Sequence, residues 1–214
     1  MPNGVIGSGC DPATTCDTCD AMKTLYFAYG SNMLVERLWR RCASARPRGI
    51  AALAGFRLSF SKTGQDGSGK ATLHFCDQSE SCVHGVLFDM VQSDLDALDR
   101  VEGRGRGYER IEITGTARLP NGQIIDVTTY IAETNYIDPT LAPFQWYLDL
   151  VVHGAQRATL PGDYCRKLAS TRTLADPMPE RLTRLEALSV LGEVAAAGKQ
   201  GLRWKHDCFH RGRD

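Results

Sequence analysis

The sequence lacks a long apolar run, an excess of basic residues and a leader-like start. No stretch approaches the roughly 18 consecutive apolar residues that a membrane span needs. The opening residues, MPNGVIGSGCDPATTCDTCD, contain neither the charged nor the apolar region of a secretory signal peptide. Lys plus Arg and Asp plus Glu are equal at 25 each, whereas nucleic-acid-binding proteins usually carry a basic excess. We therefore expect a soluble, cytoplasmic protein that binds neither membrane nor nucleic acid.

Cysteine is plentiful, but its spacing does not match a complete zinc or redox site. Cys16 and Cys19 form a CxxC, yet no second CxxC follows and no βαβ pattern surrounds it. A zinc site that combines these two with Cys10 stays open, and so does a redox-responsive role. The simpler interpretation is a flexible, cysteine-containing N-terminal extension over residues 1–22.

Hydrophobic periodicity predicts strands first and helices mostly later. The expected strands are 24–28, 50–60, 71–75 and 82–90, followed by a hairpin whose strands flank Pro120-Asn121-Gly122-Gln123. The expected helices are 33–42, 94–100 with Ser93 as its N-cap, 140–155, 161–169 and 178–197. This order predicts one α+β domain, built on a mainly antiparallel sheet or barrel, over residues 23–175. We expect residues 176–214 to form a C-terminal helix and tail that packs on this domain or on the second subunit of a homodimer.

A turn-forming tetrapeptide, YGSN at residues 29–32, separates the first predicted strand from the first predicted helix. Gly30 has no side chain that would keep a ligand away from the backbone, and Ser31 and Asn32 favour caps and turns. The N-terminus of a helix offers unpaired N–H groups to an anion. This stretch therefore either binds a carboxylate, a phosphate or a developing oxyanion, or it is an ordinary capped turn.

A carboxylate stands at the start of a glycine-rich loop. Glu102 follows a predicted helix and is succeeded by Gly103, Gly105 and Gly107 in the segment LDRVEGRGRGYERIEI. Three alternating glycines predict a sharp bend or the close approach of another group. Glu102 could serve as a general base in such a loop, or it could be a solvated surface charge, as most Glu residues are.

Together these two stretches resemble the gamma-glutamylcyclotransferase family. That family combines a strand ending in a YGSN loop with an LDxxEGxxxGY segment further along the chain, and residues 29–32 and 98–108 match both patterns. The TNY of residues 134–136 and Tyr147 resemble its C-terminal half. The resemblance covers about residues 24–170, and it implies a small mixed-strand β-barrel surrounded by helices.

The resemblance also implies a reaction from glutathione metabolism. Such an enzyme cyclises a γ-glutamyl amine or γ-glutamyl amino acid to 5-oxoproline and releases the free amine or amino acid, with no metal or cofactor. By this resemblance Glu102 is the catalytic base that takes a proton from the substrate's α-ammonium. Because an α-amine has a reference pKa near 8 and Glu one near 4.3, this transfer is uphill, and partial burial of the carboxyl would reduce the gap. The substrate-binding residues implied are Tyr29, Gly30, Ser31, Asn32, Tyr108 and Tyr147.

Other interpretations stay open, because one fold hosts several functions. A related enzyme could remove a γ-glutamyl protecting group from a specialised metabolite or open γ-glutamyl-ε-lysine crosslinks. A non-catalytic module could bind a small ligand in the same pocket. Arg104 and Arg106, in the glycine-rich loop, could meet a carboxylate on the leaving group, or they could be solvated.

Overall fold

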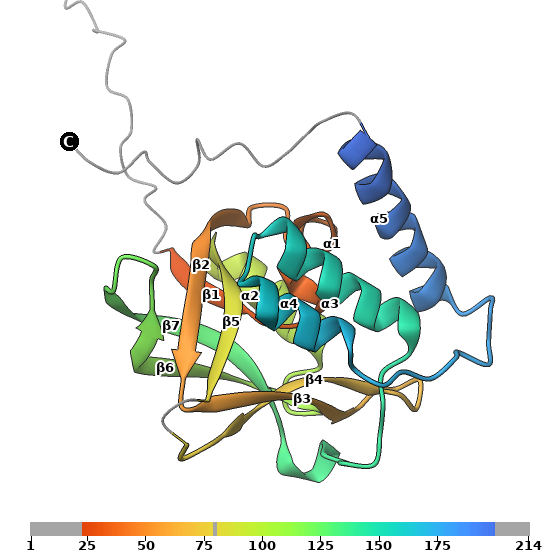
Figure 1. The fold of residues 1–214 in the computed structure, drawn as a ribbon, viewed down its shortest axis with the longest axis horizontal. Coiled ribbons are helices and arrows are strands. Elements are labelled where there is room, and N and C mark those ends of the chain that lie inside the picture. Colours follow the sequence, from red (N-terminus) through yellow and green to blue (C-terminus); the bar gives the residue numbers. More distant parts are fainter. Residues whose placement is uncertain (1–22, 79–80, 200–214) are drawn as a thin grey trace, which may run out of the picture.

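Five strands close into a barrel at the centre of the molecule (Figure 1). The computed structural model describes residues 23–78 and 81–199. In order around the barrel, the strands are β1 (Thr24–Ala28), β5 (Cys82–Met90), β2 (Arg46–Ala54), β6 (Tyr108–Arg118) and β7 (Ile124–Ala132). Neighbouring strands are antiparallel, except that β1 and β7 run parallel and close the barrel. The predicted mixed-strand α+β barrel is confirmed.

A two-stranded arm extends from the barrel and consists of β3 (Phe56–Thr63) and β4 (Gly69–Phe75). The prediction of one strand over residues 50–60 is wrong, because the chain reverses between β2 and β3 at Gly55. Its φ of +74° lies in the left-handed region, which glycine adopts without the steric cost that a Cβ imposes. β4 packs beside β7, and the arm thereby reaches the barrel.

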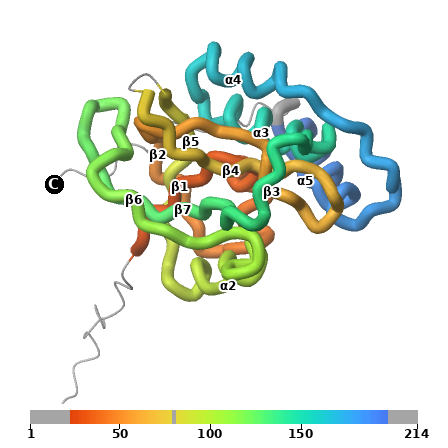
Figure 2. The backbone as a smooth tube through the Cα atoms, turned by 90° about the horizontal axis from the view of Figure 1, so that it is seen from below, coloured from red at the N-terminus to blue at the C-terminus, as the bar shows by residue number. Residues whose placement is uncertain are grey.

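Helical segments surround the strands. They are η1 (Ser31–Met33), α1 (Val35–Trp39), α2 (Gln92–Glu102), η2 (Thr134–Tyr136), α3 (Gln145–Arg157), α4 (Gly162–Ala169) and α5 (Leu182–Lys199). Figure 2 shows α2 and α4 on opposite sides of the strands. α3 packs against η1, α4 and α5. None of the helices in the described residues is long and apolar enough to cross a membrane.

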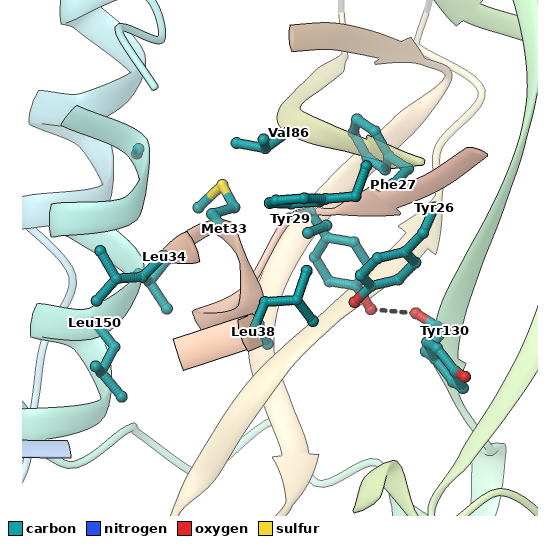
Figure 3. Close-up of a cluster of buried hydrophobic side chains, with 14 of the residues drawn as sticks. Tyr26, Phe27, Tyr29, Met33, Leu34, Leu38, Val86, Tyr130 and Leu150 are labelled. Atoms are coloured by element: carbon teal, nitrogen blue, oxygen red, sulfur yellow. Dashed lines mark hydrogen bonds between the residues drawn. The ribbon is translucent and has the colours of Figure 1, made fainter. Parts of the chain in front are cut away.

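The core lies between the barrel and α3 (Figure 3). Phe27 projects from β1, and Met33 and Leu34 fill the space between the strands and Leu150 of α3; all four side chains are buried. The burial of these large apolar groups fixes the turn after β1 against α3, which holds the YGSN stretch in place.

The predicted helix over residues 33–42 is wrong as a single element. Leu34 has extended dihedrals (φ −78°, ψ 109°) and separates η1 from the five-residue α1. Tight packing explains this interruption, because a Cβ on Gly154 of α3 would lie only 2.6 Å from the Leu34 nitrogen. The spacing of Leu34 and Leu38 indicates which residues are buried, but it cannot predict this tertiary contact.

The other predicted elements show smaller differences. Strand 24–28, strand 82–90 and the hairpin are confirmed. Ser93 is not an N-cap, since α2 begins at Gln92 after Val91. The three later helices begin at residues 145, 162 and 182, after their predicted starts. Predictions for residues 1–22 and for the tail after residue 199 lie outside the described residues.

Candidate active site

One pocket is lined by all of the site residues predicted from the sequence. It lies where β1 leads into η1, has a cavity volume of about 30 Å³ and opens to solvent. The predicted lining residues are Tyr29, Gly30, Ser31, Asn32, Glu102, Tyr108 and Tyr147. Tyr26, Ala71 and Tyr130 complete the lining. Segments far apart in the sequence thus converge on a small, tyrosine-rich space.

Glu102 is the last residue of α2. Gly103 ends the helix in the left-handed conformation (φ 70°, ψ 49°), a common helix C-terminus. Glu102 Oε1 accepts hydrogen bonds from Asn32 Nδ2 and from Arg41 Nη1, each 3.0 Å long. None of the hydrogen bonds found within residues 23–78 and 81–199 involves Glu102 Oε2. One oxygen is therefore fixed, and the other can accept a ligand proton.

The Glu102 carboxylate is mostly buried beside a cation. Its side chain is 17% exposed, as is that of Arg41, whose Nη1 lies 3.0 Å from Glu102 Oε1. Both donors approach this one oxygen, which leaves the other oxygen for a ligand.

Asn32 connects Glu102 to the end of the barrel. Its Nδ2 also lies 3.0 Å from the Tyr26 hydroxyl, and its Oδ1 accepts a 3.1 Å hydrogen bond from Arg41 Nη1. The amide is buried and has partners at both ends. Asn32 therefore orients the carboxylate as well as lining the pocket.

The pocket tyrosines are anchored to backbone groups. The Tyr108 hydroxyl donates to the Ala71 carbonyl over 2.6 Å, and the Ala71 N–H donates to the Tyr147 hydroxyl over 3.1 Å. The Tyr29 hydroxyl donates to the Tyr130 carbonyl (Figure 3). Burial raises the pKa of Tyr29, Tyr108 and Tyr147. Because each hydroxyl is hydrogen-bonded to a backbone group, these side chains form rigid walls.

The turn after β1 presents backbone donors rather than a long helix. No hydrogen bond between described residues has the N–H of Gly30, Ser31 or Asn32 as its donor. Because η1 and α1 are so short, the helix macrodipole adds little, and the free N–H groups themselves are the contribution of the turn. Gly30 is packed tightly, since a Cβ there would lie 3.1 Å from the Ala71 Cβ.

Sequence analysis missed two arginines, the half-buried Arg41 and the buried Arg37. Arg41 contacts Glu102 directly. Arg37 Nε donates to Ser31 Oγ over 3.2 Å, and desolvation lowers the pKa of Arg37 to about 10. Both belong to the stretch predicted as one helix over residues 33–42, and nothing in its spacing shows that this helix is interrupted at Leu34. Ala71 gave no signal either, because it contributes backbone groups.

The arginines of the glycine-rich loop do not line the pocket. Arg104 Nε donates to Glu109 over 2.8 Å, and its Nη1 donates to Asp99 over 3.2 Å. Arg106 is exposed. The three loop glycines have positive φ angles, as the predicted sharp bend requires. Within the described part of the chain, no group of three or more His, Cys, Asp or Glu side chains could hold a metal ion.

Comparison with known proteins identifies similar sequences. Residues 82–168 match the AIG2-like family. Gamma-glutamylcyclotransferase of Bos taurus is 35% identical over 156 residues, which cover 71% of this chain and 80% of the relative. The Homo sapiens protein of the same name is 35% identical over 169 residues, which cover 77% of this chain and 85% of the relative.

Solved structures agree with the sequence matches. A structure named gamma-glutamyl cyclotransferase superimposes with a TM-score of 0.68 at 28% identity, covering 78% of this chain and 98% of that chain. An uncharacterized Homo sapiens protein gives the same TM-score and coverage at 29% identity. The resemblance inferred from the two motifs is thereby confirmed, and this chain belongs to the gamma-glutamylcyclotransferase family.

Proposed function

We propose that this protein is a gamma-glutamylcyclotransferase that converts a γ-glutamyl amine or γ-glutamyl amino acid into 5-oxoproline and the free amine or amino acid. The observation that carries the proposal is the Glu102 carboxylate, with Oε1 held by two donors and Oε2 unbonded among the described residues, in a pocket beside free backbone N–H groups. The names of relatives that are 35% identical support the same activity.

The reaction begins with a proton transfer. Glu102 Oε2 takes one proton from the substrate's α-ammonium, and the resulting amine attacks the γ-carbonyl carbon. Because nucleophile and electrophile belong to one molecule, holding the substrate folded supplies much of the acceleration. The rigid tyrosine walls suit this role.

A tetrahedral intermediate follows, with negative charge on the former carbonyl oxygen. The N–H groups of Gly30, Ser31 and Asn32 are fixed donors that can stabilise this oxyanion or the α-carboxylate. Because these donors are already oriented by the packing of η1 against α3, they need no reorganisation during the reaction.

Collapse of the intermediate releases the leaving group. The bond from carbon to the leaving nitrogen breaks while Glu102 returns its proton to that nitrogen. Glu102 then takes the extra proton of the ring nitrogen and passes it to the released amine. The carboxylate is thus regenerated, and two protons have moved from the substrate ammonium to the product ammonium.

The test is 5-oxoproline release from γ-glutamyl-alanine, glutathione, γ-glutamyl-ε-lysine and γ-glutamyl-ethylamide. In Glu102→Gln we expect kcat/KM on the best substrate to fall by about 10²- to 10⁴-fold, the usual contribution of a general acid–base group. The matched control is Glu109→Gln, which removes an exposed carboxylate from the strand that follows the same loop. It should retain wild-type activity.

The outcomes separate the open interpretations. Release that persists in a folded Glu102→Gln variant would remove Glu102 from the mechanism. Release from γ-glutamyl-ε-lysine alone would favour an enzyme that opens crosslinks. A folded wild-type protein that releases 5-oxoproline from none of the four substrates would favour either a non-catalytic binding module or an enzyme that deprotects a specialised γ-glutamyl metabolite.

A further inference from the structure

Lys62 of β3 is a buried lysine beside the pocket whose ammonium has no anionic partner. It makes no side-chain hydrogen bond, and no carboxylate oxygen lies within 4.0 Å of Nζ, among residues 23–78 and 81–199. Nζ is also absent from the fully enclosed polar atoms that lack a partner. Most of the Lys62 side chain is therefore buried, but its ammonium is not fully enclosed.

The ammonium lies against one wall of the pocket. Nζ is 4.9 Å from the ring centroid of Tyr108 and 5.9 Å from that of Tyr136. A Cβ on Gly107 would lie 2.9 Å from Nζ, so the last glycine of the loop that follows Glu102 makes room for the lysine. The Gly30 turn instead packs on Ala71 and the Tyr147 hydroxyl. Lys62 therefore lies behind Tyr108, which lines the pocket, whereas the residues of the Gly30 turn line it directly.

This position has an energetic cost. Desolvation lowers the pKa of Lys62, and the charges of Glu102, Asp66 and Glu133 oppose that effect from a distance. Contact with aromatic rings returns only part of the cost of removing an ammonium from water. An anionic ligand in the pocket would supply the missing interaction.

The other cations around the pocket already have partners. Arg41 pairs with Glu102, Arg37 donates to Ser31, Lys70 binds Asp66, and Arg104 binds Asp99 and Glu109. Lys62 has no such partner among the described residues. Arg37 Nη1 also lacks a hydrogen bond there, but it lies 3.7 Å from the Glu186 carboxylate.

We propose that Lys62 binds the carboxylate of the leaving amino acid and thereby sets a preference for γ-glutamyl amino acids over γ-glutamyl amines. Lys62 is assigned this carboxylate because the Gly30–Asn32 N–H groups, which have no partner among the described residues, can hold the glutamyl part. As a statement about catalysis, this inference rests on the proposed function; as a statement about binding, it can be tested separately.

The test compares γ-glutamyl-alanine with γ-glutamyl-ethylamide, in which hydrogen replaces the leaving-group carboxylate. In Lys62→Met, kcat/KM for γ-glutamyl-alanine should fall about 10- to 100-fold, the effect of losing one hydrogen bond between charged groups. The value for γ-glutamyl-ethylamide should stay within twofold. Arg106→Met removes a nearby exposed charge and should change neither substrate. An equal fall for both substrates, or no fall, would overturn the inference.

A binding measurement separates this inference from the proposed reaction. Calorimetry compares the Glu102→Gln variant with the double variant Glu102→Gln, Lys62→Met. The Kd of γ-glutamyl-alanine should be about 10- to 100-fold higher for the double variant, whereas the Kd of γ-glutamyl-ethylamide should differ by less than about twofold. If Lys62→Met weakens binding of γ-glutamyl-alanine alone but the wild type releases no 5-oxoproline, Lys62 remains a carboxylate ligand and the proposed function is wrong. Release by the wild type with no difference in binding would remove the role of Lys62 alone.

Discussion

Lys62 and Lys70 face each other across the β3–β4 arm, yet their ammonium groups have different surroundings. The two residues are register partners in the antiparallel pair. Lys70 Nζ lies 2.7 Å from Asp66 Oδ2 and 2.6 Å from Ser68 Oγ, and 4.8 Å from the ring centroid of Tyr147. Lys62 also lies over a pocket tyrosine, but no carboxylate pairs with it among the described residues. Burial lowers the pKa of both lysines.

The difference shows how one residue type can serve structure or ligand binding. Asp66 and Lys70 satisfy each other, so removing either leaves a charge without its partner. Removing the Lys62 ammonium leaves no protein carboxylate unpaired. The pairing of a buried charge, rather than its burial alone, therefore indicates whether it stabilises the fold or awaits a ligand.

The largest effect on stability should come from Lys70→Met. The variant leaves the Asp66 carboxylate, whose side chain is only 9% exposed, without its cation. We expect the free energy of unfolding to fall by about 3 kcal/mol, at the low end for breaking a buried pair. Lys62→Met should change the free energy of unfolding by less than about 1 kcal/mol, because no carboxylate loses its partner. Urea denaturation of both variants measures the two values.

A similar loss of stability in the two lysine variants would contradict the comparison. The double variant Asp66→Asn, Lys70→Met provides the control. Because it removes both charges, it should be more stable than Lys70→Met alone.

Asp176 extends the comparison to a carboxylate with all of its partners in the protein. Its side chain is 1% exposed. It accepts hydrogen bonds from Arg181, the Trp146 indole and the Met178 N–H. Burial acts to raise the pKa of Asp176, but these hydrogen bonds outweigh it and lower the pKa from 3.8 to about 2. We expect Asp176→Asn to cost about 2 kcal/mol at pH 7, the scale of hydrogen bonds to a charged group.

Acid should reduce the difference in stability between the wild type and Asp176→Asn. Because the folded pKa lies below the unfolded one, the contribution of Asp176 is complete above about pH 4 and is lost as the pH falls toward 2. Denaturation at pH 7, 4 and 2.5 should show the gap between wild type and Asp176→Asn narrowing with acid. A gap that stays constant over this range would mean that Asp176 titrates normally in the folded protein.

The fold could be predicted from the sequence where its signals are local. Alternation and the Asn-Gly turn located β5, β6 and β7 because each strand carries its own pattern of buried residues. The break at Gly55 and the interruption at Leu34 could not be found in this way. One depends on which strand the chain next pairs with, and the other on a helix more than a hundred residues away.

The site residues likewise fall into those that a local motif predicts and those that only tertiary contacts reveal. Glu102 and the YGSN stretch were predicted because two motifs mark them, and the structure brings them together. Arg41 and Lys62 have no motif. Lys62 stands in an ordinary strand sequence, and its role depends on the close approach of Gly107 and Tyr108 from another part of the chain.

The smallest effect should come from Arg104→Ala, which tests the sequence-based expectation that this arginine meets the leaving-group carboxylate. Its side chain is 43% exposed and already binds Asp99 and Glu109, and exposed ion pairs contribute little to stability. We therefore expect a small change in stability. The ratio of kcat/KM for γ-glutamyl-alanine to that for γ-glutamyl-ethylamide should not change, with Arg106→Ala as the matched control. If Arg104→Ala lowered the ratio tenfold and Lys62→Met left it intact, the carboxylate would be bound by the loop. A charge paired in the free protein would then exchange its partners for substrate, and the contrast between paired and unpaired cations would no longer predict which of them binds a ligand.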